Sequence, residues 1–335
     1  MMLRTRPVLK TCEVILNYDC NARCLFCYHA SDLRGKDLPL RDAAKALLAG
    51  RKEGCWIAYF IGGEITLRPD LPAILALARS LGYPCVQVMS NGLRLADPVY
   101  ARSIVDAGAN LFRISIHGHD AGLHDKLVGV PGAHKKVMRA LDNLLGLGAE
   151  ISVNHTLNAL NYRTLPLFIE GLVSRFPTLK DINIIFSHYR GEMSVNQDLL
   201  KVRVSETAPY VLQAMDILLR RGVAVEAPML INFTPCILPG MDHLLAEWER
   251  LDDPGDDDFL VHPEGFTNRV YRMKEEERTK PKSCRRCVYD RRCLGFEREY
   301  AALYGTREFR PLSELPEPFP IRPTWSRLER MGPRP

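Results

Sequence analysis

Along the first 220 residues, short apolar runs alternate with longer segments in which apolar residues recur every three or four positions. The short runs are rich in Ile, Val and Phe, which favours β-strands, whereas the periodic segments predict amphipathic helices. Six strands are expected, at Glu13–Asn17, Trp56–Ile61, Cys85–Met89, Leu111–Ile116, Ile151–Thr156 and Ile182–Phe186. Six helices are expected, at Arg41–Lys52, Leu71–Ser80, Pro98–Ala107, Lys135–Leu147, Leu165–Arg175 and Thr207–Arg221. This alternation predicts an α/β fold built on a parallel sheet.

The pattern changes after Gly222. Val223–Phe233 predicts one more strand, and residues 234–300 read as loops and short helices interrupted by prolines. Residues 311–335 contain seven prolines and are expected to follow the surface or fray. We therefore expect two domains, 1–222 forming the α/β part and 223–335 forming a C-terminal extension.

Composition is ordinary for a soluble globular protein, with 46% apolar and 25% charged residues. No apolar run approaches the roughly 18 residues that a membrane span needs, and the first residues lack the apolar core of a secretory signal. Ten cysteines in a chain of this size indicate a reducing cytoplasm and metal ligation rather than disulfides. The net charge of +5 is too small to indicate a nucleic-acid partner.

Three cysteines near the start of the chain, Cys20, Cys24 and Cys27, form a C-x3-C-x2-C run directly after the first predicted strand. Three thiolates inside eight residues can hold three corners of a cubane iron–sulfur cluster and leave the fourth iron without a protein ligand. An open iron can bind a substrate or cofactor, so the spacing indicates chemistry. Structural zinc sites, by contrast, are closed by a fourth protein ligand.

A second motif follows the second predicted strand, where Gly62, Gly63 and Glu64 come directly after Tyr59-Phe60-Ile61. Two glycines allow close approach of the backbone to a ligand, and a carboxylate can accept a hydrogen bond from an ammonium group. Polar residues also follow the third and fourth strands, namely Ser90-Asn91-Gly92 and His117-Gly118-His119. In barrel-like α/β folds, ligands gather at these C-terminal strand ends.

Together these motifs resemble the radical S-adenosylmethionine (radical SAM) superfamily. The resemblance implies a partial (β/α)6 TIM-like barrel in which the three cysteines bind a [4Fe–4S] cluster and S-adenosylmethionine chelates the open iron. It implies that Gly62, Gly63 and Glu64 hold the methionine end of the cofactor. It further implies that Phe26 packs near the adenine and that Ser115, Ser90 and Asn154 contact the cofactor.

His117 replaces an aspartate that is common at its position in that family. Strand alternation places Arg113, Ser115 and His117 on one face, with Ile114 and Ile116 packing outward against helices. His117 is therefore a candidate catalytic residue that faces the cofactor or substrate, with proton transfer as one conceivable role. The alternative is a purely structural histidine.

A second set of cysteines lies near the C-terminus, where Cys284, Cys287 and Cys293 follow Cys236. The spacing resembles part of the SPASM/Twitch extensions of radical SAM enzymes, but Glu297 stands where the longer SPASM pattern has a further cysteine. This predicts one auxiliary [4Fe–4S] cluster, with structural zinc as an alternative, and Cys236 either completes the cluster or leaves an open iron. Residues 280–292 carry six Lys or Arg against one Asp, a surplus that would compensate an anionic cluster or attract an acidic partner.

We therefore expect an enzyme that cleaves S-adenosylmethionine to a 5′-deoxyadenosyl radical and removes a hydrogen atom from a small metabolite. Maturation of a ribosomally made peptide is the alternative, and a nucleic-acid substrate ranks third because no aromatic-interleaved binding module is present. The chain begins only 19 residues before Cys20, which favours a small substrate over a peptide bound by an N-terminal recognition domain. A flavodoxin- or ferredoxin-type protein is expected to supply electrons. A non-catalytic iron–sulfur or zinc protein is the rival from another class.

Overall fold

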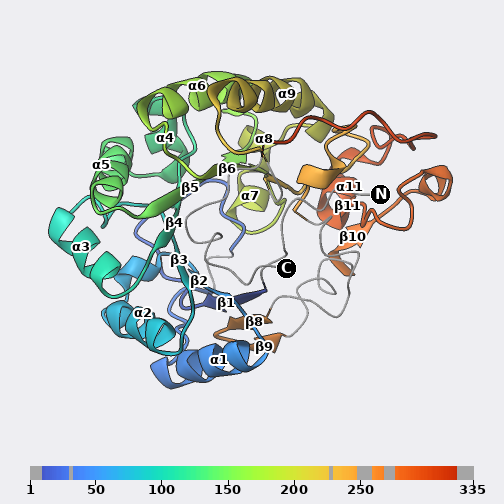
Figure 1. The fold of residues 1–335 in the computed structure, drawn as a ribbon. Coiled ribbons are helices and arrows are strands. Elements are labelled where there is room, and N and C mark those ends of the chain that lie inside the picture. The colour runs from blue at the N-terminus through green and yellow to red at the C-terminus, as the bar shows by residue number, and fades with distance from the viewer. Residues whose placement is uncertain (1–9, 30–32, 226–228, 247–258, 268–275, 323–335) are drawn as a thin grey trace.

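The computed structural model describes residues 10–29, 33–225, 229–246, 259–267 and 276–322, and it shows a curled sheet with helices around its outer side (Figure 1). The nine strands of this sheet lie in the order β7-β6-β5-β4-β3-β2-β1-β8-β9. All neighbouring strands from β7 to β8 are parallel, and β9 pairs antiparallel with β8. The sheet is a partial TIM-like barrel, and the α/β prediction is confirmed.

The strands that were predicted within the barrel are all present, with bounds that differ by a few residues. They are β1 (Thr11–Ile15), β2 (Ile57–Ile61), β3 (Cys85–Ser90), β4 (Leu111–Ser115), β5 (Glu150–Leu157) and β6 (Asp181–Phe186). The helices between them are α1 (Leu40–Lys52), α2 (Leu71–Ser80), α3 (Pro98–Asp106), α4 (Ala121–Val128), α5 (Ala133–Gly146), α6 (Leu165–Arg175) and α9 (Val204–Arg221). Short helices α7 (Glu192–Val195) and α8 (Gln197–Leu200) follow β6.

Strand alternation divides the barrel into an apolar outer layer and a more polar interior. Ile114 and Ile116 are fully buried in the core between sheet and helices, as predicted. Ser115 and His117 point to the other side and line the interior cavity. Because successive side chains of a strand point to opposite faces, the apolar residues hold the helices while the polar ones remain available for a ligand.

The region after Gly222 differs from the prediction. A strand was expected over Val223–Phe233, but within the described residues of this range β7 spans only Leu230–Ile231, so the predicted length is wrong. Residues 226–228 lie outside the described part. Residues 234–300 do not consist only of loops and short helices: β8 (Phe259–His262) and β9 (Gly265–Thr267) extend the barrel sheet beside β1. Apolar periodicity missed these strands because each is shorter than five residues.

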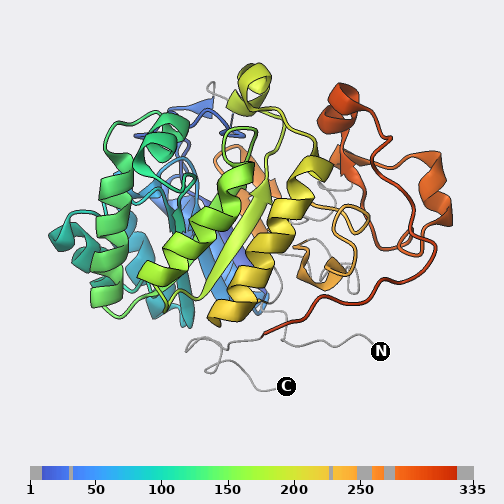
Figure 2. The ribbon, with the colours of Figure 1, turned by 90° about the horizontal axis from the view of Figure 1, so that it is seen from above.

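The rest of the extension lies to one side of the barrel (Figure 2). It contains a two-stranded sheet of β10 (Arg278–Thr279) and β11 (Phe296–Glu297), followed by helix α11 (Arg298–Tyr304). Residues 311–322 then run back along the barrel (Figure 2). Phe319 N donates a hydrogen bond to Gly240 O, and Arg322 forms an antiparallel β-bridge with Val225. This part of the expected surface-following tail is confirmed, and residues 323–335 lie outside the described part. The division into 1–222 and 223–335 stays a proposal.

No helix in the described part of the chain has the length and apolar character that a membrane crossing requires.

Candidate active site

A cavity of about 710 Å³ lies inside the barrel, at the C-terminal ends of the strands. Its volume falls within the range of small-molecule sites in proteins. The loop that follows β1 contributes the three N-terminal cysteines, Cys20, Cys24 and Cys27. The other expected site residues that line it are Phe26, Gly62, Gly63, Ser90, Ser115, His117 and Asn154. Five loops and strand ends that are far apart in sequence thus converge on one space. Of the residues expected around the catalytic cluster and its cofactor, Glu64 is absent from the lining.

The cysteine loop is held by backbone hydrogen bonds to the end of helix α4. Arg23 N donates to Val128 O and Leu25 N donates to Leu127 O, each at 2.9 Å. Gly129, in the left-handed region with φ of 67°, caps this helix, and a Cβ there would lie 2.8 Å from Arg23 O. The loop therefore depends on helix α4, which the sequence pattern did not predict.

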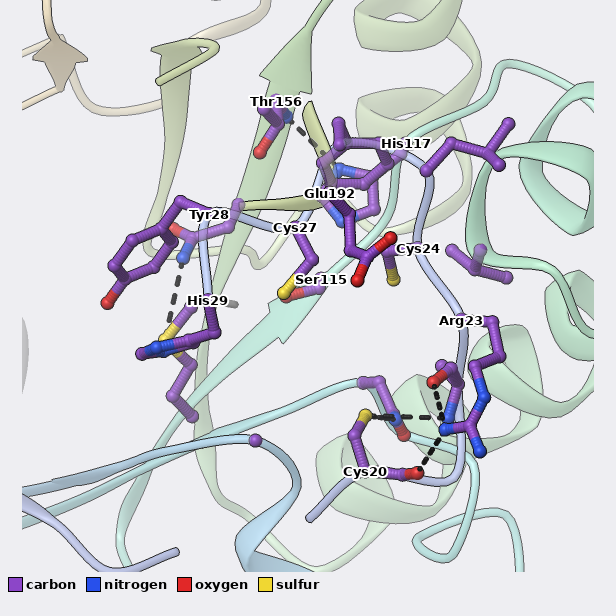
Figure 3. A pocket seen from close by; sticks show the side chains of 18 of the residues that line it. Cys20, Arg23, Cys24, Cys27, Tyr28, His29, Ser115, His117, Thr156 and Glu192 are labelled. Atoms are coloured by element: carbon purple, nitrogen blue, oxygen red, sulfur yellow. Dashed lines mark hydrogen bonds between the residues drawn. The ribbon is translucent and has the colours of Figure 1, made fainter. Parts of the chain in front are cut away.

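The three thiols point into the cavity from different parts of the loop (Figure 3). Burial raises the pKa of Cys20 to about 11 and also raises the pKa values of Cys24 and Cys27. Two groups donate to Cys20 Sγ, namely Ala22 N at 3.4 Å and Asn91 Nδ2 at 3.7 Å. Thiolates bind iron, so metal uptake must expel the thiol protons, and donors of this kind stabilise a metal-bound sulfur. The donor set therefore fits an iron–sulfur cluster.

Gly62 and Gly63 are required for a reason that the sequence did not reveal. A Cβ on Gly62 would lie 2.3 Å from Asn17 O, and one on Gly63 would lie 2.3 Å from Asp19 O. Gly63 N donates to Asn17 O at 2.8 Å, and Glu64 N donates to Asp19 O at 2.7 Å. The two glycines thus let the turn after β2 pack directly on the backbone that leads into the cysteine loop, and they also line the cavity.

Glu64 is fully buried behind this turn. Its Oε1 accepts hydrogen bonds from Thr66 N, Thr66 Oγ1 and Ser90 Oγ, and its Oε2 accepts from Asn91 N at 2.7 Å. Burial raises the pKa of Glu64, and these donors oppose the increase. The carboxylate therefore joins the turn after β2 to the turn after β3. The expected contact between Glu64 and an ammonium group stays a prediction, and Ser90 is engaged by Glu64 as well as lining the cavity.

His117 has a defined tautomer. Thr156 N donates to His117 Nδ1 at 3.1 Å, so Nδ1 keeps its lone pair and the ring proton of the neutral form sits on Nε2. Burial lowers the pKa of His117 well below its ordinary value, and His155 and His124 add to the effect. The ring packs edge-on against Phe26, with centroids 4.5 Å apart. His117 is therefore suited to donate a hydrogen bond into the cavity at neutral pH, rather than to act as a base.

The neighbouring histidines have mostly structural contacts. His124 Nδ1 accepts from His117 N at 3.1 Å, and His119 pairs with Asp120 outside the cavity lining. Asp125 accepts from Gly132 N and His134 N, so it caps the next helix rather than orienting His124. The cysteines outside both motifs, Cys12, Cys55 and Cys85, are buried.

Ser115 and Asn154 reach the cavity from adjacent strands, in register with each other. Asn183 Nδ2 donates to Asn154 Oδ1 at 3.2 Å, which fixes the orientation of the Asn154 amide. Asn154 is thus positioned by its neighbour on β6, and its cofactor contact stays a prediction.

Sequence reasoning missed several cavity residues, among them Tyr28, His188 and Glu192. Tyr28 follows Cys27 directly, His188 lies on the loop after β6, and Glu192 begins helix α7 at the end of that loop. That loop packs tightly on the cysteine loop, since a Cβ at Gly191 would lie 2.6 Å from the Tyr28 carbonyl oxygen and Met193 N donates to Cys27 O. The rule that ligands gather at C-terminal strand ends could have identified His188 and Glu192.

The C-terminal cysteines, Cys236, Cys284, Cys287 and Cys293, come together in the extension. Burial raises the pKa values of Cys284 and Cys293, the latter to about 11, and the nearby Cys236 raises both further. Gly295 N donates to Cys293 Sγ at 3.2 Å and Leu312 N donates to Cys287 Sγ at 3.4 Å. Backbone N–H donors to sulfur are a means by which proteins tune iron–sulfur clusters.

Two further observations bear on the metal chemistry. In the described residues, no three His, Cys, Asp or Glu side chains are arranged to hold a single metal ion. Burial raises the pKa values of Cys284 and Cys293, and the positive charge of Lys280 opposes this increase. Lys280 also pairs with Asp290 at 3.0 Å. The effect of the Lys280 charge on the two thiols supports the charge-compensation interpretation of the basic run.

Comparison with known proteins identifies the barrel. Residues 14–164 match the radical SAM superfamily. The Fe-coproporphyrin III synthase of Methanosarcina barkeri is 30% identical over 210 residues, which cover 62% of this chain and 52% of that protein. A probable GTP 3′,8-cyclase of Saccharolobus solfataricus is 30% identical over 55% of this chain and 58% of its own length. The match therefore spans about half the length of these curated relatives.

Solved structures resemble more of the chain. Streptococcus suis SuiB bound to its precursor peptide SuiA superposes with a TM-score of 0.65, covering 91% of this chain and 75% of SuiB at 13% identity. The anSMEcpe structure with AdoMet and the Kp18Cys peptide gives a TM-score of 0.61, with 92% of each chain covered at 15% identity. At this identity the likeness shows the fold, which includes most of the C-terminal extension.

Proposed function

We propose that this chain, whose residues 14–164 match the radical SAM superfamily, is a radical SAM enzyme in which Cys20, Cys24 and Cys27 hold a [4Fe–4S] cluster that leaves one iron for S-adenosylmethionine. The convergence of the three thiols with Gly62, Gly63, Ser115 and Asn154 on one cavity carries this proposal. When bound, the reduced cluster and its cofactor supply a 5′-deoxyadenosyl radical that removes a hydrogen atom from the substrate.

The protein's own residues would bind and orient the cofactor. The Gly62-Gly63 turn presents backbone to the cavity, His117 presents Nε2–H, and Ser115 and Asn154 present a hydroxyl and a fixed amide. Phe26, which is 8% exposed, contributes apolar surface next to His117. A cavity within the barrel limits access of water, which protects a reactive radical from side reactions.

We further propose that Cys236, Cys284, Cys287 and Cys293 hold an auxiliary [4Fe–4S] cluster. The mutual effect of their charges and the N–H···S bonds at Cys287 and Cys293 support this. Such a cluster fits acceptance of an electron from the substrate or closure of the barrel mouth. A flavodoxin- or ferredoxin-type protein would supply electrons to the catalytic cluster.

A small metabolite is the substrate class that we favour. The curated relatives are named for products or substrates of that kind, namely Fe-coproporphyrin III, heme and GTP. A cavity of about 710 Å³ also lies within the size range of small-molecule sites. Peptide maturation is the second candidate, because the extension resembles the folds of SuiB and anSMEcpe, whose structures contain peptides.

Anaerobic reconstitution tests the cofactor proposal. We expect about eight irons per chain, from two clusters of four, and 5′-deoxyadenosine when reductant and S-adenosylmethionine are added. The electron paramagnetic resonance spectrum of the reduced protein should change on addition of S-adenosylmethionine. An unchanged spectrum would contradict the open iron, and about four irons with zinc would remove the auxiliary cluster while leaving the catalytic one. A precursor-peptide gene beside this one would favour the second substrate class.

A further inference from the structure

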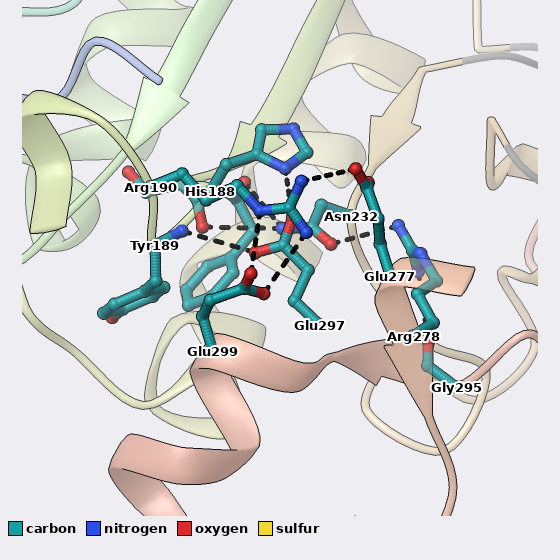
Figure 4. Close-up of polar contacts among 11 residues, drawn as sticks. His188, Tyr189, Arg190, Asn232, Glu277, Arg278, Gly295, Glu297 and Glu299 are labelled. Atoms are coloured by element: carbon teal, nitrogen blue, oxygen red, sulfur yellow. Dashed lines mark hydrogen bonds and ion pairs between the residues drawn. The ribbon is translucent and has the colours of Figure 1, made fainter. Parts of the chain in front are cut away.

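One histidine of the cavity has a carboxylate partner on the C-terminal extension. His188 lies two residues after β6, and its Nδ1 contacts the carboxylate of Glu297 on β11 (Figure 4). Glu297 is only 4% exposed, and its second oxygen accepts from Tyr189 N at 3.3 Å. The carboxylate is therefore held in place, while the His188 side chain stays 33% exposed and lines the cavity.

The neighbouring carboxylates are engaged elsewhere. Arg190 bonds to Glu277 and, through two nitrogens, to Glu299 (Figure 4). Although burial raises the pKa of Glu297, the hydrogen bond and charge of His188 and the charge of Arg278 outweigh it, and the pKa is lowered. Glu297 thus stays an anion, and it is directed at the imidazole of His188.

The other cavity histidines are in a different situation. Burial lowers the pKa values of His29, His117 and His124, with those of His29 and His124 reaching about 4. Four histidines line the cavity in the described part of the chain, and of these His188 contacts a carboxylate as an ion pair. A buried carboxylate on Nδ1 stabilises the imidazolium and leaves Nε2 as the ring atom for proton exchange.

We propose that His188 and Glu297 form an acid–base pair that exchanges a proton with the substrate, an inference that rests on the proposed function. The substrate would carry an O–H or N–H group near the reacting carbon. The Nε2 lone pair accepts that proton, so the substrate heteroatom gains a negative charge and the ring a positive one. Glu297 stabilises the ring cation, and the proton leaves to solvent in a later step.

The charged and titratable groups around His188 permit this role. The cysteine loop contributes Tyr28, whose ring centroid lies 5.7 Å from that of His188 and which is a neutral phenol at pH 7. β11 contributes Glu297, and β10 contributes Arg278, whose charge acts on Glu297. The loop of His188 itself contributes Arg190, which pairs with Glu277 and with Glu299 of helix α11. Glu297 is therefore the carboxylate in contact with the imidazole.

Histidine carbethoxylation tests the pair, because diethyl pyrocarbonate attacks a neutral imidazole nitrogen and a carboxylate that accepts the Nδ1 proton makes Nε2 more nucleophilic. The anaerobically reconstituted full chain is treated briefly at one fixed alkaline pH, and modification of each histidine is followed by peptide mass spectrometry. Glu297→Gln should slow the reaction at His188 by about fivefold, the equivalent of one hydrogen bond. Glu299→Gln, which removes a carboxylate bonded to Arg190 instead, should leave it unchanged.

Equal rates at His188 in the wild type and Glu297→Gln would overturn the proposal. If Glu297→Gln does not fold, Glu297→Asp, which keeps the carboxylate but shortens its reach toward His188, is measured in its place, and an unchanged rate at His188 would overturn the proposal. Formation of 5′-deoxyadenosine by the same wild-type sample is measured in parallel. Its absence would refute the proposed function, whereas its presence with an unresponsive His188 would refute only the acid–base pair.

Discussion

The chain contains two groups of cysteines, which differ in their positions in the fold and in whether they line the barrel cavity. Cys20, Cys24 and Cys27 lie on one short loop that is fixed by β1, the turn after β2 and helix α4, and they open into the barrel cavity. Cys284, Cys287 and Cys293 lie on one segment of the extension, residues 284–293, and Cys236 comes from a separate segment. None of these four cysteines lines that cavity. Three ligands beside a cavity suit a cluster that binds a cofactor, whereas four ligands away from it suit a closed cluster.

The sharpest way to separate the two groups is to remove one ligand from each. Cys24→Ala should abolish 5′-deoxyadenosine formation, a loss of more than about a thousandfold if radical generation depends on the open iron. Iron content should fall from about eight to about four per chain. Cys55→Ala, which alters a buried cysteine outside both groups, should keep both values. Full activity of Cys24→Ala would break the comparison.

Cys287→Ala probes the other group. Iron content should again fall from about eight to about four, but cleavage of S-adenosylmethionine should fall much less than in Cys24→Ala because the barrel cavity does not include Cys287. Colorimetric iron analysis and chromatography of 5′-deoxyadenosine provide the measurements. Cleavage lost to the same extent as in Cys24→Ala would mean that the two groups act as one.

Gly63→Ala tests whether the cysteine loop depends on the turn after β2. The added Cβ would meet Asp19 O at 2.3 Å, so overpacking should destabilise the fold by about 2 kcal/mol. The displaced loop should also bind its cluster less tightly. Gly171→Ala is the matched control, because it lies inside helix α6 with nothing within 4 Å of a Cβ and should stabilise by about 0.5 kcal/mol. Urea unfolding compares them, and equal midpoints would contradict the close contact.

The smallest expected effect concerns the contacts that join the extension to the barrel. Arg190→Gln removes pairs with Glu277 and Glu299 across this boundary and should cost about 1 kcal/mol, because the side chain is 30% exposed. Arg220→Gln removes an exposed pair within helix α9 and should cost about 0.3 kcal/mol. Thermal unfolding measures both. A larger loss for Arg220→Gln would show that the boundary contacts do not hold the extension in place.

The fold of the barrel followed from the sequence because its signals are local. The strands and helices from β1 to α9 have apolar periodicity long enough to be read directly, with the eight-residue α4 as the main omission. β7 lies inside the predicted strand Val223–Phe233 but has only two residues, which pair with β6. β8 and β9 were not predicted, and β8 pairs with the edge of β1. Propensity does not detect short strands that long-range pairing stabilises.

The cysteine spacing and the Gly62-Gly63-Glu64 run determined the kind of chemistry, because ligand number and spacing are properties of the chain alone. The tertiary structure decided which side chains meet. Glu64 accepts hydrogen bonds from Ser90 and Asn91 on the next strand and turn. Thr156 N donates to His117 and thereby sets its tautomer. Glu297 contacts His188, which lies 109 positions away in the sequence. These contacts join residues far apart in sequence, and their hydrogen bonds and burial exist only once the barrel has closed around them.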